Sequence, residues 1–180
     1  RMLAYSTIAN IGFILISLSI GNKDAYEASM FYTLSYVVMT MAAFGILLLI
    51  TCNKKPIEEI NDLKGLNSQY PWLAFLLMII MLSLAGIPPF IGFHAKLSII
   101  STLINAGNVY LAIFAVLMTV IGAYYYLRVV KVIYFDDAPG SITAISSYVL
   151  VSLNALALII LGIFPSSLGH LSSYVIQSLF

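Results

Sequence analysis

The chain alternates long apolar runs with short polar breaks, and this pattern predicts helices that cross a membrane. The most polar stretch, residues 53–71, predicts a loop outside the membrane. The whole pattern indicates an all-α membrane protein with about five transmembrane helices in a single domain, residues 1–180. The predicted helices cover about residues 2–20, 28–52, 72–104, 108–134 and 142–164.

The third apolar run, residues 72–104, is too long for one straight crossing. Its 33 residues would form a helix of about 50 Å, whereas the hydrocarbon core of a bilayer is about 30 Å thick. Pro88 and Pro89 remove two backbone donors, and Gly86 admits dihedral angles that other residues resist. We therefore expect two half-helices separated by a break near residues 86–89, with Gly92 as a further part of it.

Lys96 is the one Lys, Arg, Asp or Glu residue inside this broken run. Polar backbone at membrane depth survives only inside protein or beside water, which is also where an ionisable side chain is tolerated. The functional interpretation of Lys96 is a proton carrier that loads and releases a proton as nearby charge or hydration changes. The alternative is a lysine that snorkels to the membrane surface. The distance to Asn105, about 13 Å of helix, exceeds what a lysine stem covers and favours the functional interpretation.

His94 is a second candidate near the break, because a histidine beside water titrates close to physiological pH. It stands two residues before Lys96, and positions i and i+2 of a helix point to different faces. A proton relay and a packed histidine therefore both remain open for His94.

Polar side chains on other runs indicate a path for water or for hydrogen bonds between helices. Ser6, Thr7 and Asn10 fall near one face of the first predicted helix, where they order waters or bond neighbouring helices. Tyr125, in a run of three tyrosines near Arg128, either joins this path or belongs to an aromatic belt at the membrane surface. Helix packing and the aromatic belt are the favoured interpretations.

Composition supports the membrane assignment and excludes several functions. Apolar residues make up 62% of the chain and charged residues 8%, against about 45–50% and about 25% in soluble proteins. The lipid bilayer is therefore a partner, whereas a net charge of +1 from scattered basic residues argues against nucleic acid. Cys52 is the single cysteine, and the sequence contains no ligand run for haem or iron–sulfur clusters. We expect no cofactor and no metal site in this chain.

The basic residues predict how the chain is oriented in the membrane. With five crossings, six of the eight basic residues fall on one side of the membrane. Lys23 falls on the other side, and Lys96 lies within a span. Because cytoplasmic loops carry the excess of lysine and arginine, the Arg1 side and the loop 53–71 are predicted to be cytoplasmic, and the C-terminus outside. The six are Arg1, Lys54, Lys55, Lys64, Arg128 and Lys131.

Three motifs carry a family resemblance: LAYSTIANIGF (residues 3–13), SLAGIPPFIGFHAK (83–96) and YYYLR (124–128). Together they resemble the antiporter-like membrane subunits of proton-pumping NADH:quinone oxidoreductase, respiratory complex I. The pattern is most similar to the group called subunit N or subunit 2, because Lys96 closes the second motif, where the sister subunit M typically has glutamate. One departure is Asn10, where related sequences often have histidine; asparagine cannot take up a proton at physiological pH.

The resemblance implies a C-terminal fragment that holds most of one inverted repeat and the terminal helix of an antiporter-like subunit. It implies a membrane subunit that translocates protons, coupled to quinone reduction elsewhere in the enzyme. The subunit itself would carry out no redox chemistry and would belong to a translocase of the respiratory chain. The fragment alone is not expected to be active. The sites for NADH, flavin, iron–sulfur clusters and quinone would belong to other subunits. The partners of this chain would be other membrane subunits of complex I. The location would be a bacterial inner membrane. A multisubunit cation/proton antiporter and a purely structural membrane scaffold are the alternatives.

Overall fold

The computed structural model describes residues 2–52, 55–136, 142–144 and 148–179. Within these ranges it contains eight α-helices, one 3₁₀ helix and three short strands. The helices are α1 (Met2–Leu18), α2 (Lys23–Leu49), α3 (Leu66–Gln69), α4 (Pro71–Ala85), α5 (Ile91–Asn105), α6 (Val109–Phe135), α7 (Val149–Ile163) and α8 (Ser166–Leu179). The 3₁₀ helix is η1 (Ile60–Leu63), and the strands are β1 (Ile50–Cys52), β2 (Lys55–Pro56) and β3 (Ile142–Ala144).

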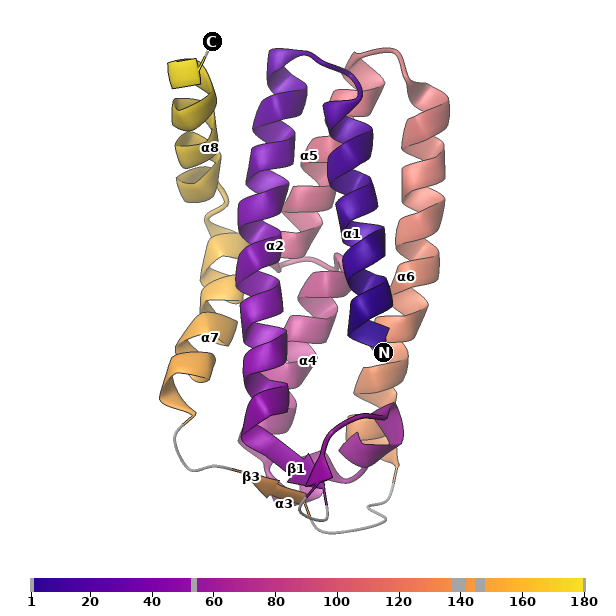
Figure 1. The fold of residues 1–180 in the computed structure, drawn as a ribbon, viewed down its shortest axis with the longest axis vertical. Coiled ribbons are helices and arrows are strands. Elements are labelled where there is room, and N and C mark those ends of the chain that lie inside the picture. Colours follow the sequence, from indigo (N-terminus) through magenta and orange to yellow (C-terminus); the bar gives the residue numbers. More distant parts are fainter. Residues whose placement is uncertain (1, 53–54, 137–141, 145–147, 180) are drawn as a thin grey trace.

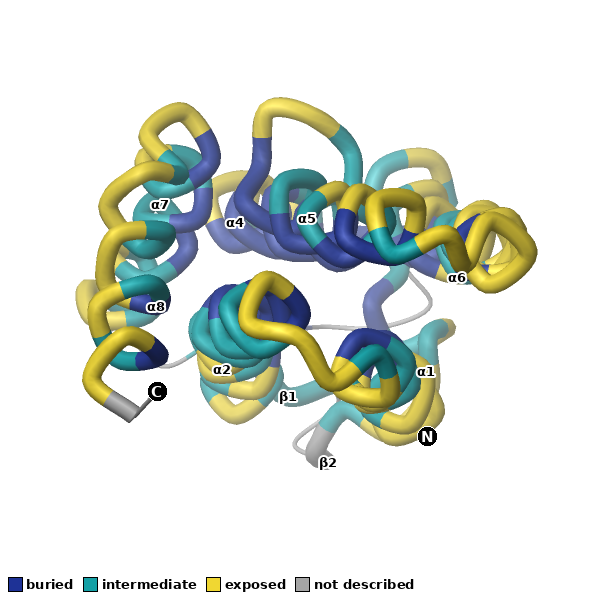
Figure 2. Tube along the Cα trace, turned by 90° about the horizontal axis from the view of Figure 1, so that it is seen from above, coloured by how far each residue is buried: buried dark blue, intermediate teal, exposed yellow. Residues whose placement is uncertain are grey.

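The long helices form two layers that run along the same axis (Figures 1 and 2). One layer contains α4, α5 and α6, and the other contains α1 and α2, while α7 and α8 close one end of both layers (Figure 2). The faces that meet between the layers are buried. α4 is the most buried element, since ten of its 15 residues are inaccessible to solvent. The broken helix is therefore the centre of the core.

α4 and α5 lie end to end, with the break between them at mid-height of the molecule (Figure 1). Each has 15 residues, or about 22 Å of helix, which is shorter than the hydrocarbon core. The predicted break is confirmed, and so is the all-α membrane fold. Gly162 of α7 fits against this break so closely that an added Cβ would collide with the carbonyl oxygen of Pro89.

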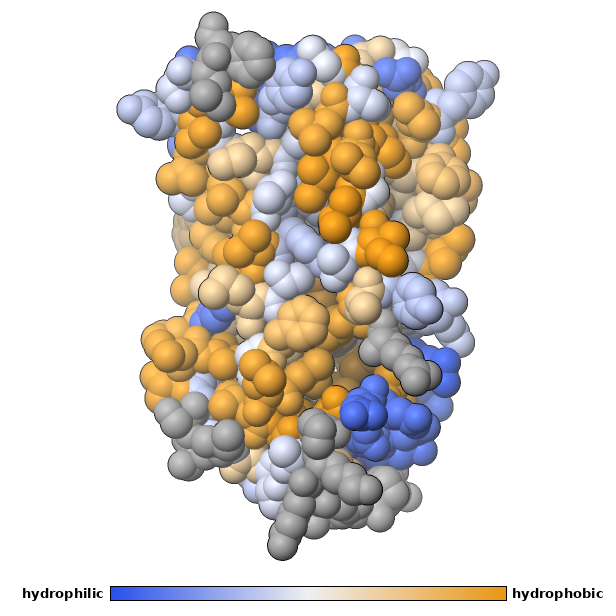
Figure 3. All heavy atoms as spheres, in the orientation of Figure 1, coloured by the Kyte–Doolittle hydropathy of each residue, from blue (hydrophilic) through white to orange (hydrophobic). Residues whose placement is uncertain are grey.

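By length and apolar composition, α2 and α6 are the described helices that could each cross a membrane alone. A third span results if α7 and α8, which bend by 83°, are taken together. α1 and α4 are apolar but shorter. The total of five crossings thus stays a prediction that counts α1 and the stacked α4–α5 pair as spans. Apolar side chains cover most of the face in Figure 3, as expected of a surface in contact with lipid.

Both predicted limits of the second helix were wrong. α2 begins at Lys23 rather than near residue 28, because the Asn22 side chain accepts a hydrogen bond from the Ala25 backbone N–H at 2.8 Å and caps the first turn. At the other end, α2 stops at Leu49 rather than residue 52. Hydropathy alone predicts the apolar middle of this helix but not its polar, capped first turn.

Residues 50–52 and 142–144, both predicted to be helical, instead form a small sheet with strand order β2-β1-β3. β1 and β3 are antiparallel, and the hydroxyls of Thr51 and Thr143 are 2.7 Å apart. Ile50 and Ile142 are buried beneath the sheet. Consequently α7 begins at Val149, not at residue 142.

The predicted loop 53–71 contains η1 and α3 in its described part. Several predicted features lie outside the described residues: residues 53 and 54 of this loop, the turn residues 137–140, Arg1 and Phe180. The predicted sidedness depended in part on Arg1 and Lys54, and it stays a prediction.

Candidate functional site

The candidate site is the end of α4 at the helix break. Gly86 has a φ of +82°, a conformation that glycine adopts without steric cost. Its backbone N–H bonds to the Ser83 carbonyl at 3.0 Å, and the Ile87 N–H bonds to the Leu82 carbonyl at 3.1 Å. These two bonds form the turn that commonly ends a helix at glycine. They satisfy two of the four backbone carbonyls that every helix leaves unpaired at its end.

Lys96 satisfies the other two. Its Nζ donates hydrogen bonds to the carbonyl oxygens of Leu84 at 2.9 Å and Ala85 at 3.1 Å. The side chain is 7% exposed, so the ammonium lies at the break and does not reach toward the membrane surface. A cation is stabilised there because the aligned peptide dipoles give a helix C-terminus partial negative charge.

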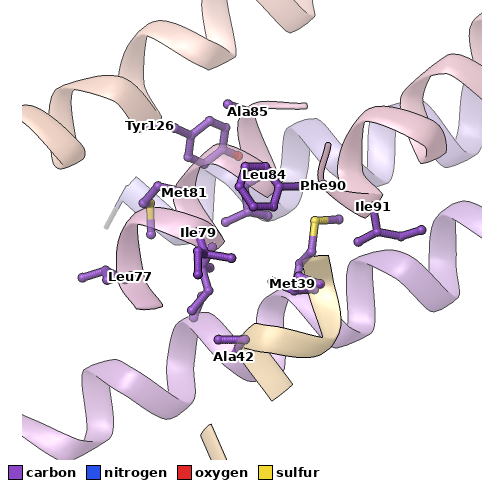
Figure 4. Close-up of a cluster of buried hydrophobic side chains, with 14 of the residues drawn as sticks. Met39, Ala42, Leu77, Ile79, Met81, Leu84, Ala85, Phe90, Ile91 and Tyr126 are labelled. Carbon is purple, nitrogen blue, oxygen red and sulfur yellow. The ribbon is translucent and has the colours of Figure 1, made fainter. Parts of the chain in front are cut away.

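Two glycines allow close packing at this helix end. A Cβ on Gly86 would lie 2.9 Å from Cδ of Lys96, so the lysine stem passes directly over the glycine. A Cβ on Gly92 would collide with the Ser83 carbonyl, and the Gly92 N–H lies 3.4 Å from Ser83 Oγ. The structure thus brings Gly86 and Gly92 to the site. Figure 4 shows buried side chains of the hydrophobic core from α2, α4, α5 and α6 gathered around the end of α4, where Leu84 and Ala85 lie.

A hydrogen-bonded chain of four polar residues links α2, α1 and α6. Tyr32 OH donates to Asn10 Oδ1 at 2.6 Å, and Asn10 Nδ2 donates to the Ser6 backbone carbonyl at 2.8 Å and to Ser6 Oγ at 3.2 Å. Ser6 Oγ also bonds Tyr126 OH. Asn10 and Ser6, two of the predicted polar-path residues, are therefore brought together, and Tyr32 and Tyr126 join them although the sequence analysis did not select them.

Thr7 and Tyr125 are not members of this chain among the described interactions. Thr7 Oγ1 donates to the Leu3 carbonyl of its own helix at 3.1 Å. Tyr125 is 50% exposed, and its ring packs edge-on against Tyr124. Both Tyr125 and Tyr126 line a groove of about 720 Å³ between α1 and α6. Tyr126 rather than Tyr125 thus carries the buried hydroxyl.

His94 is half-buried, and its ring packs edge-on against Phe93 with centroids 5.4 Å apart. No described hydrogen bond joins it to Lys96, consistent with their different faces of α5. Pro88 and Pro89 are exposed. Among the described residues, no group of three or more His, Cys, Asp or Glu side chains could hold a metal ion.

Comparison with known proteins gives this architecture a family. Residues 1–122 match the sequence family described as NADH:quinone oxidoreductase/Mrp antiporter, TM. The chain belongs to this family. It is 48% identical, over 181 aligned positions, to NADH-quinone oxidoreductase subunit N of Nitrosomonas europaea, and that alignment covers 98% of this chain and 37% of the relative.

Solved structures agree with this assignment. A chain of respiratory complex I from Thermus thermophilus superimposes with a TM-score of 0.74 at 31% identity, covering 91% of this chain and 38% of that one. A chain of the Mrp complex from Dietzia sp. DQ12-45-1b has a TM-score of 0.77 at 24% identity, covering 98% and 42%, and it shares the fold. The chain therefore spans about two fifths of the length of the family members it matches.

Proposed function

We propose that this chain is part of an antiporter-like membrane subunit of respiratory complex I, in a bacterial inner membrane, and that Lys96 carries protons through it. The name of the Nitrosomonas relative supports the complex. The observation that carries the proposal for the lysine is the buried ammonium bound to the last two carbonyls of α4, those of Leu84 and Ala85. Buried lysines without a structural pair are rare inside membranes and mark ion pathways.

The contacts of Lys96 suit a group that both holds and releases a proton. The described ion pairs belong to Lys64 and Lys131, each with Asp136, whereas Lys96 is bound by neutral carbonyls. When the ammonium loses a proton, no carboxylate is left buried without a partner. Two carbonyls at the end of α4 then lose part of their hydrogen bonding, which costs far less than an unpaired buried charge. Lys96 can thus alternate between charged and neutral states within one packed site.

The wider role follows from the resemblance. Other subunits would carry out NADH oxidation, quinone reduction, and the flavin and iron–sulfur chemistry. This chain would move protons, coupled to those reactions. The loop 53–71 would face the cytoplasm and the C-terminus the outside, as the basic residues predict. His94 is the second candidate for a relay, and its only support is its position beside the break.

A subunit of a multisubunit cation/proton antiporter is the second candidate function. It is favoured by the description of the matched family, which includes Mrp antiporters, and by the shared fold of the Mrp complex. The two functions differ in energy source. Proton movement that requires NADH supports the first, whereas proton movement driven by a sodium gradient in the absence of NADH supports the second.

The test replaces Lys96 in the full-length subunit within its assembled complex. In inverted membrane vesicles, we expect Lys96→Met to lower NADH-driven proton uptake at least about a hundredfold, the smaller end of what a proton-transfer group contributes, and Lys96→Arg to recover part of it. Lys131→Met is the matched control, because this lysine side chain is 69% exposed. Normal pumping by an assembled Lys96→Met complex would contradict the proton-carrier role and favour the structural scaffold.

A further inference from the structure

The ring of Phe13 is a second contact of the Lys96 ammonium. Phe13 is on α1, 7% exposed, and its ring centroid lies 5.7 Å from Lys96 Nζ. An ammonium within about 6 Å of an aromatic face is attracted by the ring's negative π surface, and more strongly where water is excluded. The ammonium thus contacts the carbonyls of one helix end and the aromatic ring of another helix.

The Phe13 ring is itself held in place by Tyr32 of α2. The two rings stack with centroids 5.9 Å apart and an interplanar angle of 11°. Tyr32 is fully buried, and its hydroxyl donates to Asn10 Oδ1 at 2.6 Å. Asn10 and Phe13 are three residues apart on α1 and share a face. Tyr32 therefore contacts α1 at two points, one through its hydroxyl and one through its ring, which restricts how the Phe13 ring can move.

The orientation of the Asn10 amide is fixed in turn. Its Nδ2 donates to the backbone carbonyl of Ser6 at 2.8 Å, which leaves Oδ1 to accept from Tyr32. An amide N–H does not give up its proton at physiological pH. The hydrogen-bonded row Tyr32–Asn10–Ser6 therefore does not relay protons from hydroxyl to hydroxyl. It connects α1 and α2 and continues through Ser6 to Tyr126 of α6. Its effect is to fix the position of the helices that surround Lys96.

We propose that Phe13 is a positioning residue for Lys96, with its ring fixed by Tyr32 and Asn10 so that it holds the ammonium against the end of α4. An aromatic face attracts the ammonium but cannot accept its proton, so it holds the loaded lysine without competing for the proton. The proposal deepens the proton-carrier function and rests on it for the effect on pumping. The contact itself can be tested apart from that function.

The experiment uses the full-length subunit in its assembled complex and two measurements, NADH-driven proton uptake and the melting temperature of the purified complex. Phe13→Leu removes the ring, and Phe13→Tyr keeps it. Phe31→Leu is the matched control, since Phe31 is also 7% exposed and lies on α2. The Phe13→Leu and Phe31→Leu changes are made both with Lys96 present and with Lys96→Met.

With Lys96 present, we expect Phe13→Leu to lower proton uptake about five- to thirtyfold, as expected for loss of a desolvated cation–π contact. Phe13→Tyr should recover most of this, and Phe31→Leu should stay close to the unmodified complex. Phe13→Leu should also lower the melting temperature more than Phe31→Leu does, and this excess should vanish in Lys96→Met.

Equal lowering of the melting temperature by Phe13→Leu in both lysine backgrounds would overturn the inference, whatever the pumping rates. Failure of Phe13→Tyr to recover uptake would also overturn it. If the melting temperatures show the coupling but Lys96→Met pumps normally, the contact stands and the proton-carrier function is refuted instead.

Discussion

Replacing Gly86 with alanine tests how closely the Lys96 stem depends on the helix break. At φ +82° an alanine is strained, and its Cβ would lie 2.9 Å from Lys96 Cδ and 3.3 Å from Nζ. Gly107 provides the matched control, because its φ is +77° and an added Cβ would meet no described atom within 4 Å. Both variants carry the same backbone strain, and Gly86→Ala alone also displaces the lysine.

Gly86→Ala should lower the free energy of unfolding more than Gly107→Ala, because only Gly86→Ala disturbs the hydrogen bonds of the Lys96 ammonium. Backbone strain at positive φ costs about 1–2 kcal/mol for a non-glycine residue and should be the whole effect of Gly107→Ala. Moving the lysine weakens its bonds to Leu84 and Ala85, and loss of one hydrogen bond to a charged group costs about 1.5–3 kcal/mol. We therefore expect Gly86→Ala to lower the free energy of unfolding by roughly 3–5 kcal/mol.

The assay is the thermal unfolding of the purified, assembled complex, with proton uptake measured on the same preparations. Gly86→Ala should impair both, and Gly107→Ala should cause a small loss of stability with uptake retained. In a Lys96→Ala background the excess cost at Gly86 should disappear, because the atoms that Cβ meets are gone. Equal costs for the two glycine variants would refute the argument that the lysine stem passes against Gly86.

Three further predictions concern other contacts of the site and fold. Gly92→Ala should prevent assembly, because its Cβ would collide with the backbone oxygen of Ser83, which cannot rotate away as a side chain would; the amount of assembled complex measures this. Asn10→Ala should cost about 1–3 kcal/mol in unfolding free energy, because it leaves the Tyr32 hydroxyl buried without its acceptor. Asn22→Ala should cost about 1 kcal/mol through loss of the α2 cap.

Each of these predictions has a control. Gly12→Ala on α1 should be tolerated, since an added Cβ would meet no described atom within 4 Å. Thr7→Val should cost less than Asn10→Ala, because Thr7 bonds only a carbonyl of its own helix among the described interactions. Asn108 precedes α6, where the described structure shows no side-chain capping bond, so Asn108→Ala should be close to neutral. Equal effects of a variant and its control would contradict the corresponding argument.

The helix break could be predicted from the sequence because its causes are local. Glycine and proline act on their own backbone, and the length of the run exceeds a bilayer whatever the rest of the chain does. The small sheet could not be predicted in this way. Its pairing joins Thr51 to Thr143, 92 positions apart, through strands of three residues each. Strands this short give no periodic signal, and only the packing of α2 beside α7 brings their ends together.

The choice among the three tyrosines shows a similar limit. Consecutive residues on a helix are rotated by about 100°, so Tyr124, Tyr125 and Tyr126 must face three directions. Which one is buried depends on the rotation of α6 against α1, and this is set by tertiary contacts. Tyr126 is 5% exposed, whereas the other two are at least half exposed. The sequence alone favours an aromatic belt for this run and cannot show that Tyr126 is the buried member.

The partners of Lys96 were not predicted from the sequence, but a general rule about helix ends explains them. A helix that ends at Gly86 leaves four carbonyls unpaired, and the glycine turn satisfies only two. Inside a membrane the other two, on Leu84 and Ala85, need a donor from elsewhere in the protein. Lys96 has three donors on a long stem, and it lies five residues, or about 1.4 turns, beyond the start of α5 at Ile91. If Lys96 carries the proton as proposed, the same residue also completes the helix end, so a change in its protonation changes the bonding at the break.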